Sequence, residues 1–325
     1  MRLAFTIATV NYMAQALTIG KSYLAHNPAD KFVVYLFDRI GNRFDKEEFA
    51  PIELVEVDPD WISGFDVMLK NYTLFELITA IKPALSLHAI KSNPSYDSYI
   101  FLDSDMLVYS DFGEVDRLFS EGFELIISTH FFEVLPKDSC YPDEKTYFNC
   151  GIYNAGFMAF KNGGQSIEFL NWWMERLKTE CVLSFEEGLF YEQIWLNLVP
   201  LHFDKSIIVK HMGYNVGYWN LHERDLQSSL EKGYKVNIEF PLVFFHFSGF
   251  AIDQLESVST YQNRYSFVSK PVLLELFRDY SQKVFRNGYA RFSVLACYYA
   301  PLVKQSPKRT FMKKVKSRLV RLLLS

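Results

Sequence analysis

Apolar and polar positions recur along the chain with two different periods. Short apolar runs rich in β-branched and aromatic residues predict strands over 3–10, 31–38, 52–57, 98–103, 124–129, 151–160 and 237–248, the last with a bulge or edge position at Pro241. Helical spacing predicts helices over 11–27, 73–93 (restarting at Pro83), 167–177, about 186–198, and beyond 270. Strand, helix and strand at this spacing form a βαβ unit. The pattern therefore predicts an α/β domain on a mostly parallel, twisted sheet flanked by helices.

The segment YIFLDSDMLVY (99–109) places two carboxylates, Asp103 and Asp105, directly after one of these apolar runs. Side chains at i and i+2 of an extended segment point to the same face, so these two are expected to converge. Like charges held that close repel one another unless a cation lies between them or water screens them. An exposed turn is the alternative. Because ligands of parallel sheets bind beyond the carboxyl ends of the strands, the position favours a divalent-cation site.

Composition adds an asymmetry of charge. The 325 residues, 49% of them hydrophobic, can bury a large core. Eight of the 34 Lys and Arg residues lie within 304–325, where no acid occurs, which leaves 26 basic against 38 acidic residues, a net charge of −12, on the rest. An acidic body argues against a nucleic-acid binder, whose basic footprint would lie on the folded domain. We predict a main domain over 1–268 and a helical region over 269–325.

The basic tail also carries an apolar stripe. Phe311, Val315, Leu319 and Leu322 lie near one side of a helix, which predicts an amphipathic helix lying on an anionic membrane surface. A solvated basic helix is the alternative. No apolar stretch approaches the roughly 18–20 residues of a membrane span, and the first ten residues are interpreted as a core strand, not a signal peptide. With four scattered cysteines, we expect a cytoplasmic protein, peripheral on the inner face of the cytoplasmic membrane.

Several common phosphate and hydrolase motifs are missing from the sequence. There is no G-x-G-x-x-G after the first strand and no G-x-x-x-x-G-K-[ST], so dinucleotide and P-loop chemistry lack their phosphate cradles. H-E-x-x-H and G-x-S-x-G are also absent. A bound phosphate would therefore have to be neutralised by a metal ion and by scattered donors.

Five stretches, in the order ATVNYM, LDSDM, NAGFMAF, LFYEQIWLNLV and FHFSGF, resemble the retaining glycosyltransferases of family 8. The resemblance spans residues 1 to about 250. It implies the A-type nucleotide-diphospho-sugar transferase fold, with 1–268 as the catalytic domain. It also implies transfer of a hexose from a nucleotide sugar, expected to be UDP-linked, to a glycan or lipid-linked glycan in cell-surface polysaccharide synthesis. The alternatives are a catalytically inactive carbohydrate-binding protein on the same fold and a nucleotidyltransferase that makes nucleotide sugars.

The resemblance implies a metal site. Asp103, Asp105 and His246 match the ligands of Mn²⁺ (or Mg²⁺), which would hold the diphosphate of the donor. Taken alone, His246 within FFHFS would be read as a core histidine. A neutral imidazole beside two carboxylates nevertheless suits such an ion.

The resemblance further implies where the donor lies. Glu192 and Gln193 would line the sugar as the catalytic pair, with Gln193 next to the anomeric carbon. The substrate-binding set comprises Thr9, Asn11, Tyr12, Lys82, Ser104, Asn154, Ala155, Gly156 and Gly249. Tyr12 could stack on the base, and Gly156 would let backbone approach the ligand. The aromatic segment GYNVGYWNLHER (213–224) is either an acceptor-side loop or a packed aromatic corner.

Two positions depart from the family pattern. The family usually has an acidic residue where Thr9 stands, which weakens the assignment of uridine as the base. It also has a Lys-Pro-Trp shortly after the histidine, and this chain has none. Arg264 is our candidate for the missing cation, because a guanidinium binds phosphate oxygens in bidentate fashion.

Overall fold

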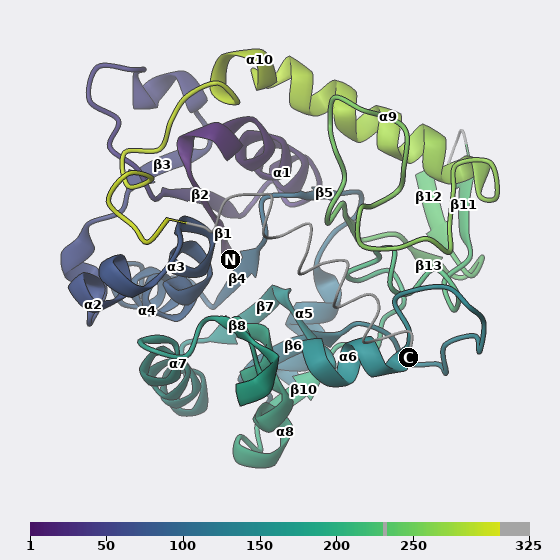
Figure 1. Ribbon diagram of the computed structural model, residues 1–325, viewed down its shortest axis with the longest axis horizontal. Coiled ribbons are helices and arrows are strands. Elements are labelled where there is room, and N and C mark those ends of the chain that lie inside the picture. The colour runs from purple at the N-terminus through teal and green to yellow at the C-terminus, as the bar shows by residue number, and fades with distance from the viewer. Residues whose placement is uncertain (230–232, 306–325) are drawn as a thin grey trace.

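A computed structural model describes residues 1–229 and 233–305, and Figure 1 shows its arrangement. The amphipathic tail predicted from the sequence, within 306–325, lies outside the described residues. In the part that is described, none of the helices combines the length and apolar character needed to cross a membrane.

A seven-stranded sheet with the order β10-β6-β7-β4-β1-β2-β3 forms the centre of the molecule. Its strands are β1 (Arg2–Ala8), β2 (Lys31–Leu36), β3 (Glu53–Glu56), β4 (Ser98–Leu102), β6 (Leu125–Thr129), β7 (Tyr153–Lys161) and β10 (Ser206–Ile208). Four neighbouring pairs run parallel, and β7 runs antiparallel to both of its neighbours. The mostly parallel sheet predicted from the sequence is confirmed.

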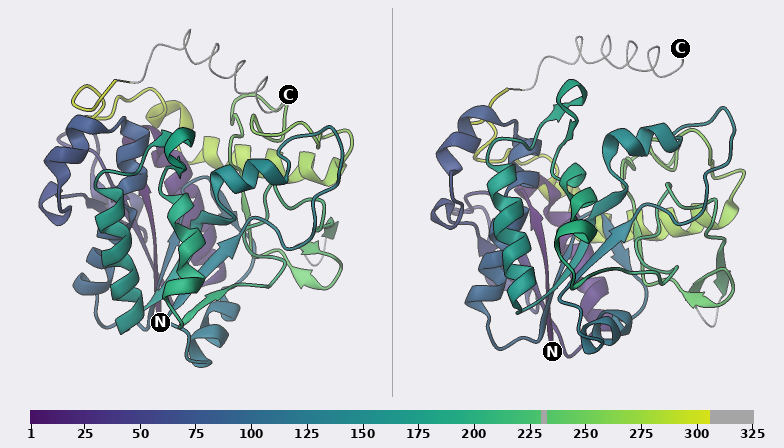
Figure 2. Two further views of the ribbon diagram at one scale, coloured as in Figure 1. Left: turned by 60° about the horizontal axis from the view of Figure 1, so that its bottom comes forward. Right: turned by 90° about the horizontal axis from the view of Figure 1, so that it is seen from below.

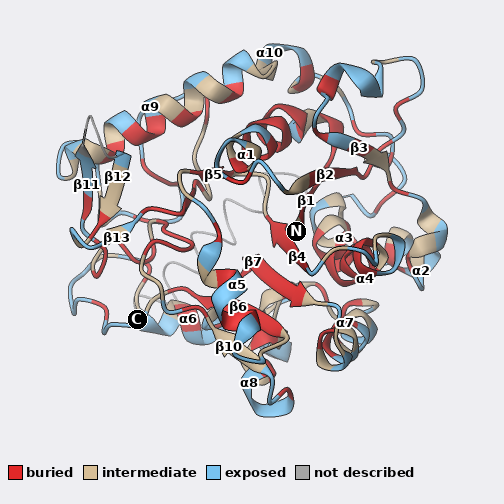
Figure 3. Cartoon of the chain, turned by 180° about the vertical axis from the view of Figure 1, so that it is seen from behind, coloured by how far each residue is buried: buried red, intermediate tan, exposed pale blue. Residues whose placement is uncertain are grey.

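Helices cover both faces of this sheet (Figure 2). One face carries α1 (Met13–His26), α5 (Gly113–Ser120), α9 (Pro271–Arg286) and α10 (Tyr289–Phe292). The other face carries α2 (Phe65–Asn71), α3 (Leu74–Ala80), α4 (Lys82–Ser92), α7 (Gly164–Leu177) and α8 (Val199–His202). Side chains of a strand alternate between faces. Accordingly, Leu3 and Phe5 of β1 belong to one buried cluster and Ala4 belongs to the other, and the central strands are almost wholly buried (Figure 3).

Short elements complete the fold beside the large sheet. They are β5 (Met106–Val108), β14 (Phe244–His246), the hairpin β8 (Leu183–Ser184) and β9 (Leu189–Phe190), the three strands β11 (Leu226–Ser229), β12 (Gly233–Val236) and β13 (Phe240–Pro241), and α6 (Glu144–Cys150). Single 3₁₀ turns lie at Val10–Tyr12, Lys46–Phe49, Pro59–Trp61, Phe185–Glu187 and Gln193–Leu198. The antiparallel pair β5–β14 sets His246 opposite Met106, directly after Asp105.

Two elements predicted from the sequence were wrong. The predicted helix over about 186–198 is a hairpin followed by a 3₁₀ turn, because Gly188 (φ 71°) and Tyr191 (φ 48°) adopt left-handed backbone that no α-helix contains. The predicted strand over 237–248 begins late, because Asn237 (φ 52°) and Ile238 (φ 66°) adopt left-handed backbone in the turn before β13, and it is divided into β13 and β14, which pair with different strands, β12 and β5. Pro241 does lie on the edge strand β13.

The C-terminal helices pack on the main body. The Tyr280 ring of α9 stacks on Phe247, with ring centroids 3.9 Å apart. Asn287 follows α9. Its side-chain Nδ2 donates to the Thr18 hydroxyl of α1 at 2.9 Å, and its side-chain oxygen Oδ1 accepts from the Lys21 ammonium. The division of the chain at residue 268 stays a prediction.

Candidate metal and donor site

Three predicted ligands meet at the edge where β4 ends. Asp103 and Asp105 lie in the turn between β4 and β5, and His246 ends β14. One donor atom from each residue lies within 4.8 Å of the other two, and Nε2 of His246 is 3.0 Å from a carboxylate oxygen of Asp105. Two carboxylates and an imidazole at this spacing could hold a divalent cation. The carboxylates converge through a turn, not through the extended segment expected from the sequence.

Gly156 lacks a side chain, which leaves room for His246 and Asp103 to lie close together. A Cβ atom added at Gly156 would lie 2.6 Å from Cε1 of His246 and 2.9 Å from Oδ2 of Asp103. The Asp103 N–H donates to the Gly156 carbonyl at 2.8 Å, so β7 also fixes the backbone of the turn. The three ligand side chains and the space left open at Gly156 fit a small divalent ion bound by oxygen and nitrogen atoms.

Charges around the three ligands perturb their ionisation in opposite senses. Burial raises the pKa of Asp103 above its ordinary value, although the nearby Lys82 ammonium opposes this. Burial acts in the same direction on Asp105, but the attraction of His246 outweighs it and lowers the pKa of Asp105. For His246, burial lowers the pKa, and the stronger combined attraction of Asp105 and Asp103 leaves it raised. A divalent cation bound by these three residues would compete with protons for the same ligand atoms.

Lys82 lies between Asp103, one of the three candidate metal ligands, and Glu192. Its ammonium lies 2.8 Å from a carboxylate oxygen of Glu192 and 3.1 Å from Asp103, and it donates to the Ala155 carbonyl at 3.3 Å. Lys82 is 4% exposed. Burial lowers its pKa, yet the two carboxylates more than compensate and raise it. Lys82, which the family resemblance places in the substrate-binding set, is thus a buried cation between two carboxylates, and its contact with the donor stays a prediction.

Polar side chains on β7 and on the following 3₁₀ turn lie beside the metal group. The Asn154 side-chain oxygen accepts from the Gly156 N–H at 3.0 Å, and Gln193 Oε1 accepts from the Ala155 N–H at 3.4 Å. Gln193 Nε2 donates to the Cys150 carbonyl at 2.8 Å, which holds this side chain against α6. The sequence placed these residues near the donor sugar, and the structure gathers them in one polar cluster.

The backbone that presents Glu192 and Gln193 is strained. Tyr191 directly precedes them with φ 48°, a conformation that costs a bulky residue free energy. The Trp173 indole N–H of α7 donates to the Glu192 carbonyl at 3.0 Å and fixes the segment in place. Strain held by surrounding contacts is common at functional sites.

The remaining predicted donor residues lie around the same edge. Thr9 donates its hydroxyl proton to the Asn11 side-chain oxygen at 2.7 Å, and Tyr12 is half-exposed. Burial, together with the charge of Asp105, raises the pKa of the Tyr12 hydroxyl. Gly249 (φ 71°) lies against the Tyr261 ring, where an added Cβ would approach to 2.5 Å. Ser104 lies in the turn between the two aspartates. Of the three residues at the end of β1, Thr9 is buried, Asn11 is partly buried and Tyr12 is exposed.

Arg264 is engaged elsewhere. Its guanidinium binds both carboxylate oxygens of Asp138, at 3.1 and 3.0 Å, and donates to the Pro142 carbonyl at 3.0 Å and the Cys140 carbonyl at 3.4 Å. These bonds hold the loop before α6. Among the described residues, no contact joins Arg264 to Asp103, Asp105 or His246.

We expect the Arg264→Ala variant to lose stability, not donor turnover. The Arg264 side chain is only 9% exposed, and its guanidinium bonds two backbone carbonyls of the loop before α6 as well as the exposed Asp138 carboxylate, so its removal should lower the free energy of unfolding. Urea denaturation and donor turnover per folded molecule measure the two effects. A drop in turnover of tenfold or more at unchanged stability would instead support Arg264 as the cation that binds the diphosphate of the donor.

The sequence reasoning missed a second layer of polar residues behind the ligands: Ser128, His130 and Asn215. All three are buried, and Asn215 belongs to the aromatic segment 213–224. Burial lowers the pKa of His130 to about 4, so this imidazole is neutral. An asparagine inside an otherwise aromatic run was the available signal, because a buried amide needs hydrogen-bond partners.

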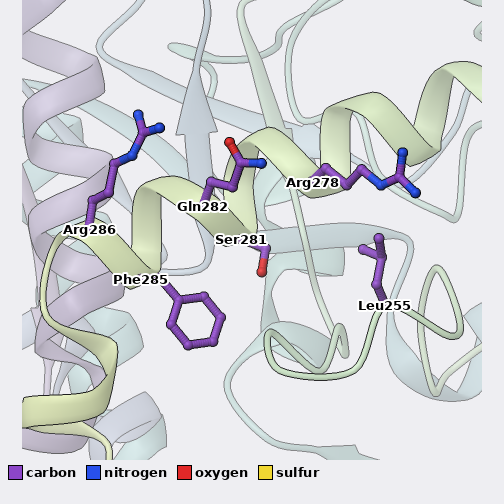
Figure 4. Close-up of a pocket in the computed structure, with 6 residues that line it drawn as sticks. All are labelled: Leu255, Arg278, Ser281, Gln282, Phe285 and Arg286. Atoms are coloured by element: carbon purple, nitrogen blue, oxygen red, sulfur yellow. The ribbon is translucent and has the colours of Figure 1, made fainter.

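A surface hollow of about 390 Å³ lies along α9 (Figure 4). It is lined by Leu255, Arg278, Ser281, Gln282, Phe285 and Arg286. None of the predicted site residues contributes to it. The convergence of ligands, and not the presence of a hollow, therefore locates the candidate site.

Comparison with known protein sequences finds two relatives but no family model. No family model matches the chain. Two Bacillus subtilis (strain 168) proteins are similar in sequence: uncharacterized protein YfnF is 27% identical over 188 residues, which are 56% of this chain and 59% of the relative. Uncharacterized protein YfnD is 27% identical over 239 residues, which are 70% of this chain and 71% of the relative.

A solved structure matches nearly the whole chain. The crystal structure of the galactosyltransferase LgtC, in complex with donor and acceptor sugar analogues, gives a TM-score of 0.52 at 13% sequence identity. The match covers 96% of this chain and 100% of that one. The chain thus has the A-type glycosyltransferase fold, as expected from the sequence.

Proposed function

We propose that this protein is a metal-dependent, retaining glycosyltransferase that moves a hexose from a nucleotide sugar, most simply a UDP-sugar, to a glycan or lipid-linked glycan. The observation that carries the proposal is the convergence of Asp103, Asp105 and His246 within 4.8 Å, beside Asn154 and Gln193. The cluster lies beyond the carboxyl ends of parallel strands, where sheets of this type bind ligands.

Asp103, Asp105 and His246 would hold Mn²⁺ or Mg²⁺, which supplies a Lewis acid for the departing diphosphate. Lys82 supplies one positive charge between the carboxylates of Asp103 and Glu192 and offsets part of the repulsion between them. On the sugar side, Gln193 Oε1 is held by the Ala155 N–H and directs its negative end toward positive charge that develops at the anomeric carbon. An amide is a poor nucleophile, so we assign Gln193 to stabilisation of a front-face reaction.

The family resemblance supports the remaining parts of the proposal. We propose that 306–325 attach the enzyme to the inner face of the cytoplasmic membrane, where a lipid-carried acceptor would be presented. We propose cell-surface polysaccharide synthesis as the process served. Tyr12 and Asn11 would face the base of the donor.

Release of nucleoside diphosphate from a panel of nucleotide sugars tests the proposal. We expect slow hydrolysis of one donor with Mn²⁺, lost with EDTA and reduced at least tenfold in the Asp103→Asn variant, because the cation then lacks a charged ligand. Asp97→Asn is a matched control: it neutralises an exposed carboxylate just before the same strand, β4, and should keep wild-type turnover.

Silence across the panel calls for a second measurement. Calorimetric binding of UDP that requires Mn²⁺ would support an enzyme that awaits its acceptor. No turnover and no Mn²⁺-dependent UDP binding together would sink the proposal and favour an inactive carbohydrate-binding protein. Turnover that survives EDTA would remove the metal from the mechanism.

A further inference from the structure

A line of buried polar side chains runs behind His246. Its members are Ser128, His130, Asn154, Asn215 and His246, each at most 8% exposed. Asn215 is at its centre: Nδ2 lies 2.9 Å from the Ser128 hydroxyl and 3.0 Å from the Asn154 side-chain oxygen, and Oδ1 lies 3.3 Å from Nδ1 of His246. Asn215 is 1% exposed, so water does not offer its amide alternative partners.

The direction of these hydrogen bonds is set at the far end of the line. Nδ1 of His130 lies 2.9 Å from the Ile152 carbonyl, and a carbonyl only accepts, so Nδ1 carries the proton. Nε2 of His130 must then accept from Asn154 Nδ2, 3.3 Å away. The Gly156 N–H, which only donates, independently points to the oxygen of Asn154. Two backbone groups thus give the Asn154 amide one orientation.

That orientation passes to His246 through Asn215. Because Asn154 presents its oxygen, Asn215 must present Nδ2 to it, which leaves Oδ1 of Asn215 facing the imidazole. An amide oxygen only accepts, so Nδ1 of His246 carries a proton. Nε2 lies 3.0 Å from a carboxylate oxygen of Asp105, to which it donates in this structure, and it is the nitrogen that a cation would bind in place of that proton.

We infer that Asn215 is a positioning residue of the metal site, which selects the Nδ1–H tautomer and the ring orientation of His246. The inference rests on the proposed function. Histidines that bind metals commonly donate their other ring N–H to a carbonyl or carboxylate, which fixes the tautomer. Without Asn215, the remaining partner of the ring is the Asp105 carboxylate at Nε2, which favours a proton on the nitrogen that should bind the ion.

The backbone restricts which substitutions are informative. Asn215 has φ 49°, a left-handed conformation that Gly, Asn and Asp tolerate best. Asn215→Gly keeps this backbone and removes the acceptor, whereas Asn215→Asp keeps both the backbone and an oxygen facing Nδ1. Comparing the two separates the hydrogen bond from the shape of the loop.

Mn²⁺ binding to the full chain, followed by loss of the free-ion electron paramagnetic resonance signal, tests the inference without relying on activity. We expect Asn215→Gly to raise the Mn²⁺ dissociation constant by about 10- to 100-fold. Asn215→Asp should bind at least tenfold more tightly than the Gly variant. Circular dichroism melts report folding, and Asn215→Ser, whose shorter side chain does not reach the ring, replaces the Gly variant if that does not fold.

Each outcome has one meaning. Wild-type affinity in Asn215→Gly, or equal weakening in the Gly and Asp variants, would overturn the role of Asn215 while the metal site stands. Failure of the wild-type chain to bind Mn²⁺ would overturn the metal site, and the role of Asn215 with it. Weak binding in the Gly variant with recovery in the Asp variant would support the inference.

Discussion

Replacing Lys82 with methionine should lower the free energy of unfolding by about 3 kcal/mol. Lys82 is buried between Glu192 and Asp103, and removing one partner of a buried ion pair typically costs about 3–5 kcal/mol because a charge is left uncompensated. Asp103 keeps a 30% exposed side chain, so water relieves part of this cost and the loss should fall at the lower end. Urea denaturation followed by tryptophan fluorescence measures it.

The double variant Lys82→Met with Glu192→Gln is the control. It removes one of the two orphaned carboxylates and should recover part of the stability that the single variant loses. The loss should also be smaller at pH 5 than at pH 8. Burial raises the pKa of Asp103 even with Lys82 present, and a carboxyl group that takes up a proton as the pH falls no longer needs the ammonium. An equal loss at both pH values and no recovery would contradict the charge explanation.

Replacing Gly156 with alanine should reduce donor turnover at least about 100-fold and weaken Mn²⁺ binding. The new Cβ would lie 2.6 Å from the His246 ring and 2.9 Å from both Asp103 and Asn154, so at least one of these must move. A displacement of about 1 Å in a reacting group can cost on the order of 10²-fold in rate. Nucleoside-diphosphate release and Mn²⁺ titration read out the two effects.

Gly164→Ala provides the matched comparison. Gly164 begins α7, and a Cβ there meets nothing within 4 Å. Alanine at that position should leave turnover unchanged and stabilise the helix slightly, because glycine is the poorer helix former. Wild-type turnover in Gly156→Ala would mean that the chemistry does not occur between His246 and Asp103.

The sequence predicted most strands of the central sheet well, because these strands are short, continuous apolar runs, as is typical of strands buried on both faces of a sheet. It missed β10, a run of only three residues. It also read helix across 186–198, where apolar spacing is helical but Gly188 and Tyr191 are left-handed. The periodicity of apolar residues cannot predict such a strained backbone, because contacts with residues distant in sequence hold it in place. The hydrogen bond from Trp173 to the Glu192 carbonyl is one of these contacts.

The site was predictable only as far as its motifs. Only Ser104 separates Asp103 from Asp105 in the sequence, and the family resemblance added His246, so their convergence could be anticipated. Asn215 could not, because its function depends on three partners far away along the chain, which only the fold brings together. Arg264 was chosen for its chemistry, and the sequence did not show that Asp138 already binds its guanidinium.

The antiparallel strand β7 bears on how such a protein could be engineered. Parallel strands β1 and β4 contribute the residues that follow their ends, whereas β7 reaches the same edge with its beginning, where Asn154 lies. The start of β7 therefore supports the proposed cation site through Gly156 and Asn154, whereas the proposed sugar contact of Gln193 comes from the 3₁₀ turn after Glu192. A library confined to that turn could change the preferred donor sugar while the proposed ligands of the ion and the residues that orient them stay untouched. Selection for new sugar nucleotides would sensibly begin there.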